Sequence, residues 1–471
     1  MTLRISNLLT ISHVRAINLE AVSDAAIGSV ATDSRTAGRG DVFVAFRGSR
    51  VDAHDFVADV CKRGALCCVV EQRWYRRNAA AVSGLPLFVV KDSMLAYGAI
   101  AQLHRAQFNV PVLAITGSNG KTSTREMVAA VLRSKFRVLA TDGNFNNHIG
   151  LPATLLRLTP EHQIVVTEMG TNQPGDIAYL CGIANPTHGL ITNIGRAHIE
   201  KLISREGIAE EKGVLYSSLP ADGVALINAD EPLLRIKLPR RVRSIRYGTR
   251  KGSDVRIADV KLDRSGRVQL RIEAPEFTAK PITIRLKAVG RHSAYNAAAA
   301  VAAGFAFGCG VSKIKAALES VESFDKRLQI GSAREITVIN DTYNANPDSM
   351  LAAIDLLQQI KIDGARCVVL GDMLELGKAT RSEHEALGAA LAATGIPYVL
   401  TYGRHARAIS RAVLGVAKVA MHFTDKAALC ETLDALLAPG DAVLIKGSRS
   451  MRMEDVAAHL LQSDTIEEAH A

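Results

Sequence analysis

The sequence predicts an α/β protein of three domains, and three observations support this prediction. The chain has 471 residues, which is enough for about three domains that each bury a core of their own. Hydrophobic residues make up 48% of it, with 36 glycines and one tryptophan, a composition that favours strands alternating with helices over a β-sandwich. From about residue 109 onward, strand-like apolar runs alternate with helix-length segments, which is typical of parallel β–α–β units.

Residues 1–108 are expected to form the smaller N-terminal α/β domain, with strands at 42–46 and 68–71. A polar segment at 32–36 contains Ser34 and Arg35. A hydroxyl and a guanidinium suit a phosphate group, so these two residues are candidates for substrate binding. An Asx-type turn with a surface arginine explains the same residues equally well.

A phosphate-binding loop is predicted near the start of the central domain, which we place at residues 109–325. The apolar run Val112–Ile115 is expected to be a buried strand, and a loop with two glycines and then a segment with helical spacing follow it. The glycines let the backbone approach an anion, and the N–H groups of loop and helix point at it. The residues expected to surround a bound nucleotide are Gly117, Ser118, Asn119, Gly120, Lys121, Thr122 and Ser123.

Two side chains of this loop have expected roles. Lys121 would reach the β- and γ-phosphates, and the hydroxyl of Thr122 or Ser123 would hold Mg²⁺. The spacing departs from the full Walker motif because Ile115 stands where its first glycine belongs, so an ordinary tight turn is the alternative. The strand before the loop and the helix after it favour a nucleotide site.

The remaining strands of the central domain are predicted at 136–140, 163–168, 188–192 and 223–227, which indicates a P-loop-type parallel sheet with its ligand at the carboxyl ends. Glu168 ends one run, where a carboxylate would meet Mg²⁺ on the nucleotide. Another run ends at Asn193, and His198 follows it on the same rim. A strand-end glutamate is often only solvated, but two such ends beside a phosphate loop favour a metal site.

Three asparagines of the central domain are ambiguous from the residues alone. Asn146 and Asn147 could bind a substrate or build a turn, and Asn296 could contact adenine or cap a helix. The basic run at 235–251 has no interleaved aromatic residue beyond Tyr247, which indicates a solvated β-rim and not an RNA platform. The net charge of +10 fits anionic substrates and also weak, nonspecific nucleic-acid binding. Because the basic run has only one aromatic residue, we expect no nucleic-acid partner.

Residues 326–471 are expected to form a second open parallel sheet. Strands are predicted at 335–340, 366–370, 397–401, 418–422 and 442–446, with helices at 348–360, 381–393, 405–414, 426–437 and 453–461. Polar clusters follow three of these strands, at 341–349, 371–377 and 446–449. Polar residues at successive carboxyl ends of one sheet indicate a second ligand-binding face.

The cysteines and the N-terminus favour a cytoplasmic protein. Seven scattered cysteines show no CxxC pair or zinc spacing, which is typical of reduced thiols in the cytosol. The N-terminal residues lack a sustained apolar region of the signal-peptide kind, and we expect no membrane span. We also expect a monomer.

Several strings in the chain resemble the Mur ligases, in the family's order and over nearly the whole chain. They are TGSNGKTS, EMGTNQPGDI, TNIGRAHIE, HSAYNAAAA, DTYNANPDSM and GDMLELG, of which the last two are the most specific. The resemblance implies a domain for a UDP-sugar precursor, a central ATPase and a C-terminal Rossmann-like domain for an amine. It also implies ATP and Mg²⁺ as cofactors, with UDP-N-acetylmuramoyl-tripeptide and D-alanyl-D-alanine as the substrates joined through an acyl phosphate.

The resemblance also implies roles for single residues. Lys121 and Thr122 would bind phosphates and Mg²⁺, Glu168 and His198 would be metal ligands, and Lys212 matches the lysine that the family carbamylates to hold a second Mg²⁺. Lys121, Lys212 and His198 are therefore the expected catalytic set. ATP contacts are expected from Asn296, Arg327 and Asp341, and substrate contacts from Ser34, Arg35, Asn146, Asn147, Asn344, Asn346 and Arg449.

The chain departs from the family's usual residues at Ser293, His148 and Val214, and His148 lies in the expected substrate loop. Three alternatives stay open. Folylpolyglutamate synthase shares the loop and the reaction type, but the DTYNANPDSM string and the N-terminal domain argue against it. A Mur ligase for an amino acid such as diaminopimelate is disfavoured because no DNPR-like string is present. A non-enzymatic ATP-driven module would release phosphate without needing both a carboxylate and an amine.

Overall fold

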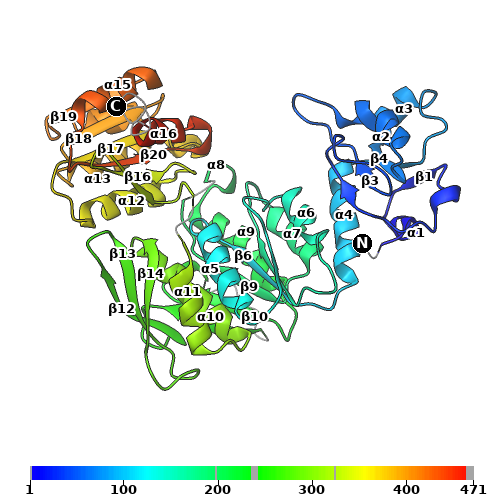
Figure 1. The fold of residues 1–471 in the computed structure, drawn as a ribbon, viewed down its shortest axis with the longest axis horizontal. Coiled ribbons are helices and arrows are strands. Elements are labelled where there is room, and N and C mark those ends of the chain that lie inside the picture. Colours follow the sequence, from blue (N-terminus) through cyan, green and yellow to red (C-terminus); the bar gives the residue numbers. More distant parts are fainter. Residues whose placement is uncertain (1–2, 197–198, 235–241, 323–324, 463–471) are drawn as a thin grey trace, which may run out of the picture.

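The computed structural model describes residues 3–196, 199–234, 242–322 and 325–462. Three sheets follow one another along the chain, and Figure 1 shows them as three lobes, with the central one between the N-terminal (blue) and C-terminal (yellow to red) lobes. The predicted α/β class is confirmed. Within the described ranges, no helix is both long enough and apolar enough to cross a membrane.

The N-terminal sheet has the strand order β1-β5-β4-β3-β2, with β1 antiparallel to β5 and the other pairs parallel. The Asp92 side chain caps α4 by accepting the N–H groups of Met94 and Leu95. Helix α4 then runs along the central domain and packs against α6 and α7. The elements are β1 Arg15–Ile17, β2 Val30–Ala31, β3 Val42–Val44, β4 Cys67–Glu71 and β5 Leu87–Val90, with α1 Ile5–Leu8, α2 Val57–Lys62, α3 Gln72–Asn78 and α4 Ser93–Ala106.

The central sheet has the order β14-β13-β12-β11-β10-β9-β6-β8-β7. The four strands predicted after the phosphate loop are confirmed as β7 to β10. The strands are β6 Val112–Thr116, β7 Val138–Ala140, β8 Ile164–Glu168, β9 His188–Ile191, β10 Val224–Asn228, β11 Arg243–Gly248, β12 Val255–Leu262, β13 Arg267–Glu273 and β14 Ile282–Val289. The helices are α5 Lys121–Arg133, α6 Gly150–Leu155, α7 Asp176–Ala184, α8 Ile199–Leu202, α9 Arg205–Ser217, α10 His292–Ala306 and α11 Val311–Ser320.

Strand β6, which leads into the phosphate loop, is buried along its whole length. Leu113 and Ile115 belong to the hydrophobic core under α5 and α10, while Val112 and Ala114 belong to the opposite core under α7 and α9. Because helices cover both faces of the sheet, side chains on both sides of a central parallel strand are buried, and the strand appears in the sequence as a continuous apolar run. Helix α10 approaches α5 closely, since a Cβ on Gly304 would lie 2.8 Å from Val131.

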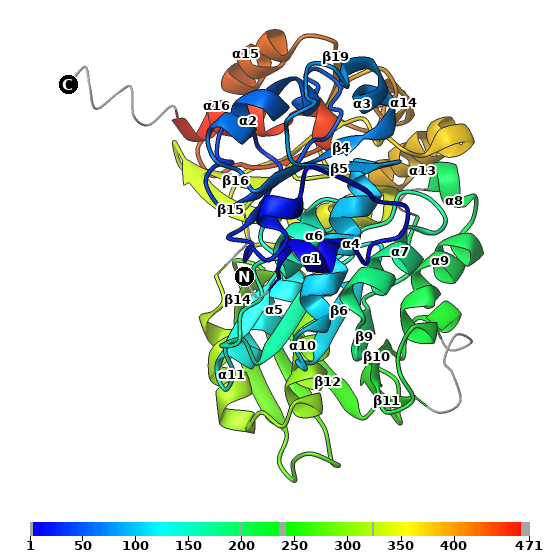
Figure 2. The ribbon, with the colours of Figure 1, turned by 90° about the vertical axis from the view of Figure 1, so that its right-hand side faces the viewer.

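The parallel sheet predicted for the central domain is extended at one end by β12, β13 and β14, where β12 pairs antiparallel with β13 and β13 with β14. Figure 1 and Figure 2 show this extension below the C-terminal lobe, and the turn between β12 and β13 touches that lobe, since the Lys361 N–H donates to the carbonyl of Arg264 at 2.9 Å. The prediction of a solvated rim at 235–251 is wrong for β11, which pairs with β10 and β12. Ile245 and Tyr247 are buried while Arg243 and Arg246 are exposed, so the basic residues occupy the outer positions of an internal strand. Residues 235–241 lie outside the described residues.

The C-terminal sheet has the order β15-β16-β20-β17-β18-β19. Its five predicted strands are confirmed, but an additional short edge strand, β15, pairs antiparallel to β16. The strands are β15 Gln329–Ala333, β16 Ile336–Asp341, β17 Arg366–Gly371, β18 Tyr398–Tyr402, β19 Val419–Phe423 and β20 Ala442–Lys446. The helices are α12 Pro347–Gln359, α13 Thr380–Ala392, α14 Arg407–Ala412, α15 Lys426–Leu436 and α16 Glu454–Gln462.

Candidate active site

A cavity of about 1000 Å³ lies between the central and C-terminal domains, at the carboxyl ends of the central parallel strands. One wall is the phosphate loop with the ends of β8, β9 and β10. The other wall comes from residues 327–328, the loop after β16, the start of α12 and Lys446 at the end of β20. The cavity gathers most residues that the sequence singled out. Those that line it are Ser118, Asn119, Gly120, Lys121, Thr122, Ser123, Asn146, Asn147, Glu168, Asn296, Arg327, Asp341, Asn344 and Asn346.

The two glycines of the phosphate loop allow two close approaches. Gly117 has φ +148°, and a Cβ there would lie 1.9 Å from the Thr192 hydroxyl. Gly120 has φ +76°, and a Cβ there would lie 2.7 Å from Asn296 Oδ1. Helix α5 begins directly after Gly120, so its free N–H groups face the cavity, as an anion site requires.

Lys121 is the first residue of α5 and lies at the cavity wall. Its Nζ donates to the carbonyl oxygens of Gly117 at 2.8 Å and of Ser118 at 3.4 Å. Burial lowers the pKa of Lys121, while the nearby Glu168 carboxylate raises it and Arg327 lowers it further. The ammonium group therefore sits inside the loop, where the phosphates of a nucleotide would lie.

Glu168, the expected metal ligand, is 1% exposed at the end of β8. Its Oε1 accepts a hydrogen bond from Asn146 Nδ2 at 2.8 Å, and its Oε2 lies 3.4 Å from Arg125 Nη1. The buried Arg125 also donates to the carbonyl of Gly143. Asn146, expected to bind substrate, thus holds the Glu168 carboxylate, while Asn147 Oδ1 accepts N–H groups at the start of α6.

The Glu168 carboxylate and the Thr122 hydroxyl both line the cavity, and oxygen ligands of this kind are what Mg²⁺ prefers. Thr122 Oγ1 accepts a hydrogen bond from Arg327 Nη2 at 2.9 Å. His198, the other expected ligand, lies outside the described residues. Within the part of the chain that the structure describes, no three His, Cys, Asp or Glu side chains form a metal cluster. The donors present fit Mg²⁺, with further oxygens left to come from phosphate or water.

Lys212 lies on α9 and is 1% exposed. Its Nζ has no hydrogen-bond partner among the residues that the structure describes. Burial and the charge of Lys121 lower the pKa of Lys212 well below its usual range, against the raising effect of Glu211. The neutral amine is the form that reacts with CO₂, and burial without a hydrogen-bond partner favours that form, so the side chain fits the expected carbamate.

The C-terminal wall places Arg327 and Asp341 at the cavity. The Arg327 guanidinium lies 3.8 Å from the centre of the Tyr343 ring. Asp341 Oδ2 pairs with the buried Lys446 ammonium at 2.5 Å, and Lys446 Nζ also donates to the carbonyl of Asn344 at 2.9 Å. These contacts hold the 341–344 segment as one polar unit on the wall that faces the phosphate loop.

The expected amine-binding residues lie in three different settings. Asn344 lines the cavity, where its Oδ1 accepts the N–H groups of Ala345 and Arg449. Asn346 caps α12, and its Nδ2 donates to Asn119 Oδ1 of the phosphate loop at 2.7 Å. The Arg449 guanidinium is more than half exposed and pairs with Glu454 at 2.8 Å; it does not line the cavity, but it lies 5.8 Å from the ring centre of Tyr343, which does.

Ser34 and Arg35 are not brought to this cavity. Arg35 is exposed and pairs with Asp33 at 2.6 Å, a hydrogen bond that lowers the pKa of that carboxyl to about 2. The sequence reasoning also missed residues of the site itself. Arg125 supports Glu168, and Arg196 bridges to the C-terminal domain. Arg125 is one of several charged residues of α5, so the sequence carried no signal that singled it out.

Comparisons with known proteins point to one family in both the central and the C-terminal part of the chain. A family model described as the Mur ligase middle domain matches residues 115–304, and one described as the Mur ligase, glutamate ligase domain matches residues 326–449. The chain is similar to the UDP-N-acetylmuramoyl-tripeptide–D-alanyl-D-alanine ligase of Bacillus subtilis, with 36% identity over 93% of this chain and 94% of that protein.

Two solved structures are similar over nearly their whole length. The crystal structure of MurF from Acinetobacter baumannii has a TM-score of 0.83 and 33% identity, covering 93% of this chain and 94% of that one. The structure of MurF ligase from Thermotoga maritima in complex with ADP has a TM-score of 0.81 and 28% identity, covering 93% and 98%. These likenesses extend through all three sheets.

Proposed function

This chain belongs to the Mur ligase family, and on that premise we propose that it joins D-alanyl-D-alanine to UDP-N-acetylmuramoyl-tripeptide at the expense of ATP. This reaction is a step of peptidoglycan precursor synthesis. The observation that carries the proposal is the shared cavity. Its central wall holds the phosphate loop, Lys121 and Glu168, and its C-terminal wall presents polar groups for a second substrate.

The chemistry requires activation because a carboxylate is a poor acyl donor. Transfer of the γ-phosphoryl group to a carboxylate oxygen of the tripeptide gives an acyl phosphate and ADP. The neutral amine of D-alanyl-D-alanine then attacks the carbonyl carbon, an amide forms, and phosphate leaves with the oxygen that came from the carboxylate. Phosphoryl transfer chiefly needs positioned positive charge, which Lys121 and Arg327 supply at this cavity.

Mg²⁺, when bound, would neutralise phosphate charge, and Glu168 and Thr122 would hold it. We assign His198 to the same ion, and the carbamate of Lys212 to a second one. Asn296, Arg327 and Asp341 would contact ATP across the two domains. Closure of the domains on both substrates would exclude water from the acyl phosphate.

We assign one substrate to each domain. Residues 109–325 would bind ATP, residues 326–471 the dipeptide, and residues 1–108 the UDP-linked precursor, with Ser34 and Arg35 as candidate contacts. All seven cysteines are free thiols, which supports a reducing, cytoplasmic location. We propose that the enzyme acts as a monomer, since one chain supplies both walls of the cavity.

Phosphate release tests the proposed function. The purified protein is incubated with ATP, UDP-N-acetylmuramoyl-tripeptide and a panel of amines that includes D-alanyl-D-alanine and diaminopimelate. We expect phosphate release that needs both the tripeptide and the dipeptide, and that matches the amide formed. Phosphate release without an amine, or with diaminopimelate in place of the dipeptide, would reject this assignment.

Replacing Asn344 with alanine is expected to raise the KM for D-alanyl-D-alanine without raising the KM for the UDP-precursor. Its amide lies at the C-terminal wall of the cavity, and losing one neutral hydrogen bond costs about 1 kcal/mol, or roughly fivefold. Arg449→Ala should act in the same direction, whereas Asn346→Ala would also disturb the phosphate loop through Asn119. Steady-state kinetics that vary each substrate in turn provide the measurement.

Arg452→Ala is the matched control, because Arg452 is exposed and pairs with Asp455 near Arg449 in the chain. Its kinetic constants should equal those of the unchanged protein. If Asn344→Ala and Arg449→Ala raised the KM for the UDP-precursor and left the dipeptide KM unchanged, the amine site would lie elsewhere.

A further inference from the structure

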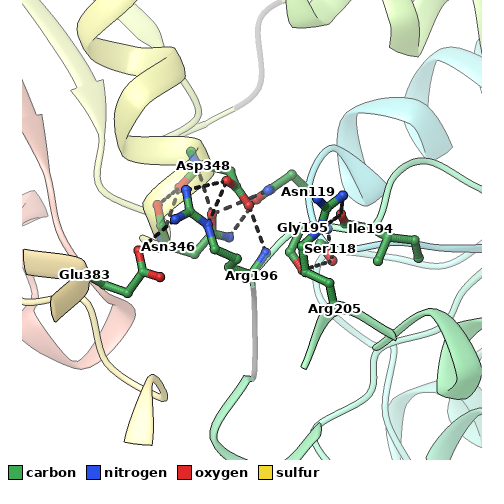
Figure 3. A network of polar contacts seen from close by, with 10 residues as sticks. Ser118, Asn119, Ile194, Gly195, Arg196, Arg205, Asn346, Asp348 and Glu383 are labelled. Carbon is green, nitrogen blue, oxygen red and sulfur yellow. Dashed lines mark hydrogen bonds and ion pairs between the residues drawn. The ribbon is translucent and has the colours of Figure 1, made fainter. Parts of the chain in front are cut away.

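A short loop after β9, residues 192–196, joins the phosphate loop to the C-terminal domain (Figure 3). On the phosphate-loop side its contacts are dense. Thr192 Oγ1 donates to the carbonyl of Asn119 at 2.6 Å, and the Asn119 N–H donates to Asn193 Oδ1 at 3.0 Å. The Gly195 N–H donates to Ser118 Oγ at 2.8 Å. The two loops therefore form one hydrogen-bonded unit.

On the other side, Arg196 binds two carboxylates of the C-terminal domain. Its backbone N–H donates to Asp348 Oδ2 at 2.8 Å, and its Nη2 donates to Asp348 Oδ1 at 2.8 Å. Its Nη1 donates to Glu383 Oε2 at 2.9 Å. Asp348 lies in the first turn of α12 and Glu383 in the first turn of α13, so one guanidinium fixes the beginnings of two helices. A planar fork with several donors suits such a bridge better than a lysine would.

Two further contacts make the fit between these surfaces close. Asn346, the cap of α12, donates to Asn119 of the phosphate loop. Gly195 packs against Asp348, since a Cβ on Gly195 would lie 2.6 Å from Asp348 Oδ2. A side chain at position 195 would therefore displace the Asp348 carboxylate from its place against the backbone of residues 195 and 196. We call the loop at 192–196, together with Asp348 and Glu383, the docking bridge.

We propose that Arg196 is a positioning residue of the ligase reaction, which docks the C-terminal domain onto the phosphate loop through Asp348 and Glu383. The proposal rests on the proposed function. Arg196 lines the cavity, but its guanidinium is engaged by these two carboxylates and not aimed at a phosphate group. Arg327 and Asp341, which reach the cavity from the C-terminal domain, depend on this docking for their distance from the nucleotide.

The bridge is electrostatic and partly exposed. The Arg196 side chain is 31% exposed, that of Asp348 36%, and that of Glu383 15%. Charge-assisted, bidentate pairs are stronger than neutral hydrogen bonds, but salt screens them at this exposure. Docking of the C-terminal domain should thus weaken as ionic strength rises. This effect of salt should be larger in the unchanged protein than in variants that lack part of the bridge.

The test compares Arg196→Ala with the unchanged full-length protein. We expect kcat for amide formation to fall by about 100-fold, because a small misplacement of reacting groups has effects of that size. The radius of gyration in small-angle X-ray scattering should rise, and kcat should lose its dependence on ionic strength. Adding Asp348→Ala to Arg196→Ala should cause less loss than Asp348→Ala causes alone, since both changes remove the pair between the guanidinium and the carboxylate, while Arg196→Ala keeps the backbone N–H bond to Asp348.

Arg381→Ala is the matched control. Arg381 lies on α13, the helix that carries Glu383, but its side chain pairs with Glu385 within that helix. It should leave kcat and the radius of gyration unchanged. Should Arg196→Ala fail to fold, two other variants replace it with the same expectations. Asp348→Asn keeps the size of the side chain, and Gly195→Ala displaces the Asp348 carboxylate.

The proposal is overturned if folded variants of the bridge keep the kcat and radius of gyration of the unchanged protein, or if Arg196→Ala and Asp348→Ala lower kcat independently. The scattering measurement needs no turnover. If the unchanged protein fails to make the amide but its bridge variants have a larger radius of gyration, the proposed function is rejected and the docking bridge is retained.

Discussion

Replacing Lys121 with alanine is expected to abolish ligase activity while the fold remains intact. The Lys121 ammonium lies within the phosphate loop, and loss of one such charge contact costs about 3–4 kcal/mol of transition-state stabilisation, or roughly 10²–10³ in kcat. Among the described residues its Nζ donates to two backbone carbonyls, so its loss leaves no carboxylate without a partner. Amide formation and thermal unfolding of the same preparation provide the measurement.

Lys135→Ala is a closely matched control for this variant. Lys135 follows the end of α5, and its Nζ also donates to two backbone carbonyls, those of Phe307 and Gly308. The two substitutions therefore remove the same kind of contact, but only Lys121 lies at the cavity. Lys135→Ala should keep normal turnover. Near-normal turnover in a folded Lys121→Ala protein would contradict the assignment of the loop.

Replacing Lys212 with alanine is expected to inactivate the enzyme, and short carboxylic acids should partly restore it. The Lys212 amine is buried without a hydrogen-bond partner in the described part of the chain, and burial lowers its pKa, which favours the neutral form that can attack CO₂. The resulting carbamate would supply oxygen ligands to a second Mg²⁺. Loss of that charge stabilisation should lower kcat by about 100-fold or more.

Rescue distinguishes this role from a structural one. An added acid can occupy the space of the missing carbamate, whereas it cannot replace an ammonium. Lys121→Ala should therefore stay inactive at every acid concentration at which Lys212→Ala recovers. A fully active Lys212→Ala protein, or one that no acid restores, would count against the carbamate.

The strands that carry the site could be predicted from the sequence, because buried parallel strands are short apolar runs bounded by polar residues. β6, β8, β9 and β16 were found in this way, together with the side chains at their carboxyl ends. The antiparallel strands β12 to β14 were missed. Their apolar and charged residues alternate, as in β13, so they do not form the continuous apolar runs by which the parallel strands were found.

Side-chain partners distant in sequence could not be predicted. Asn119 and Asn346 are 227 residues apart, and Arg196 and Asp348 are 152 apart, so no local pattern indicates that they meet. The same limit applies to Asn146, whose amide holds Glu168 on a neighbouring strand. The resemblance supplied the expected roles of Lys212, Arg327 and Asp341, which spacing alone does not indicate.

An oxygen-isotope experiment tests the central claim most directly, namely that this cavity transfers the γ-phosphoryl group of ATP to the tripeptide carboxylate. The tripeptide is labelled with ¹⁸O in both oxygens of the reacting carboxylate, and the enzyme turns it over with ATP and D-alanyl-D-alanine in unlabelled water. If an acyl phosphate forms, one ¹⁸O stays on the phosphate when the amine attacks, and each phosphate released should carry one labelled oxygen. Released phosphate without the label would show that water or another group takes the phosphoryl group, and it would contradict this account.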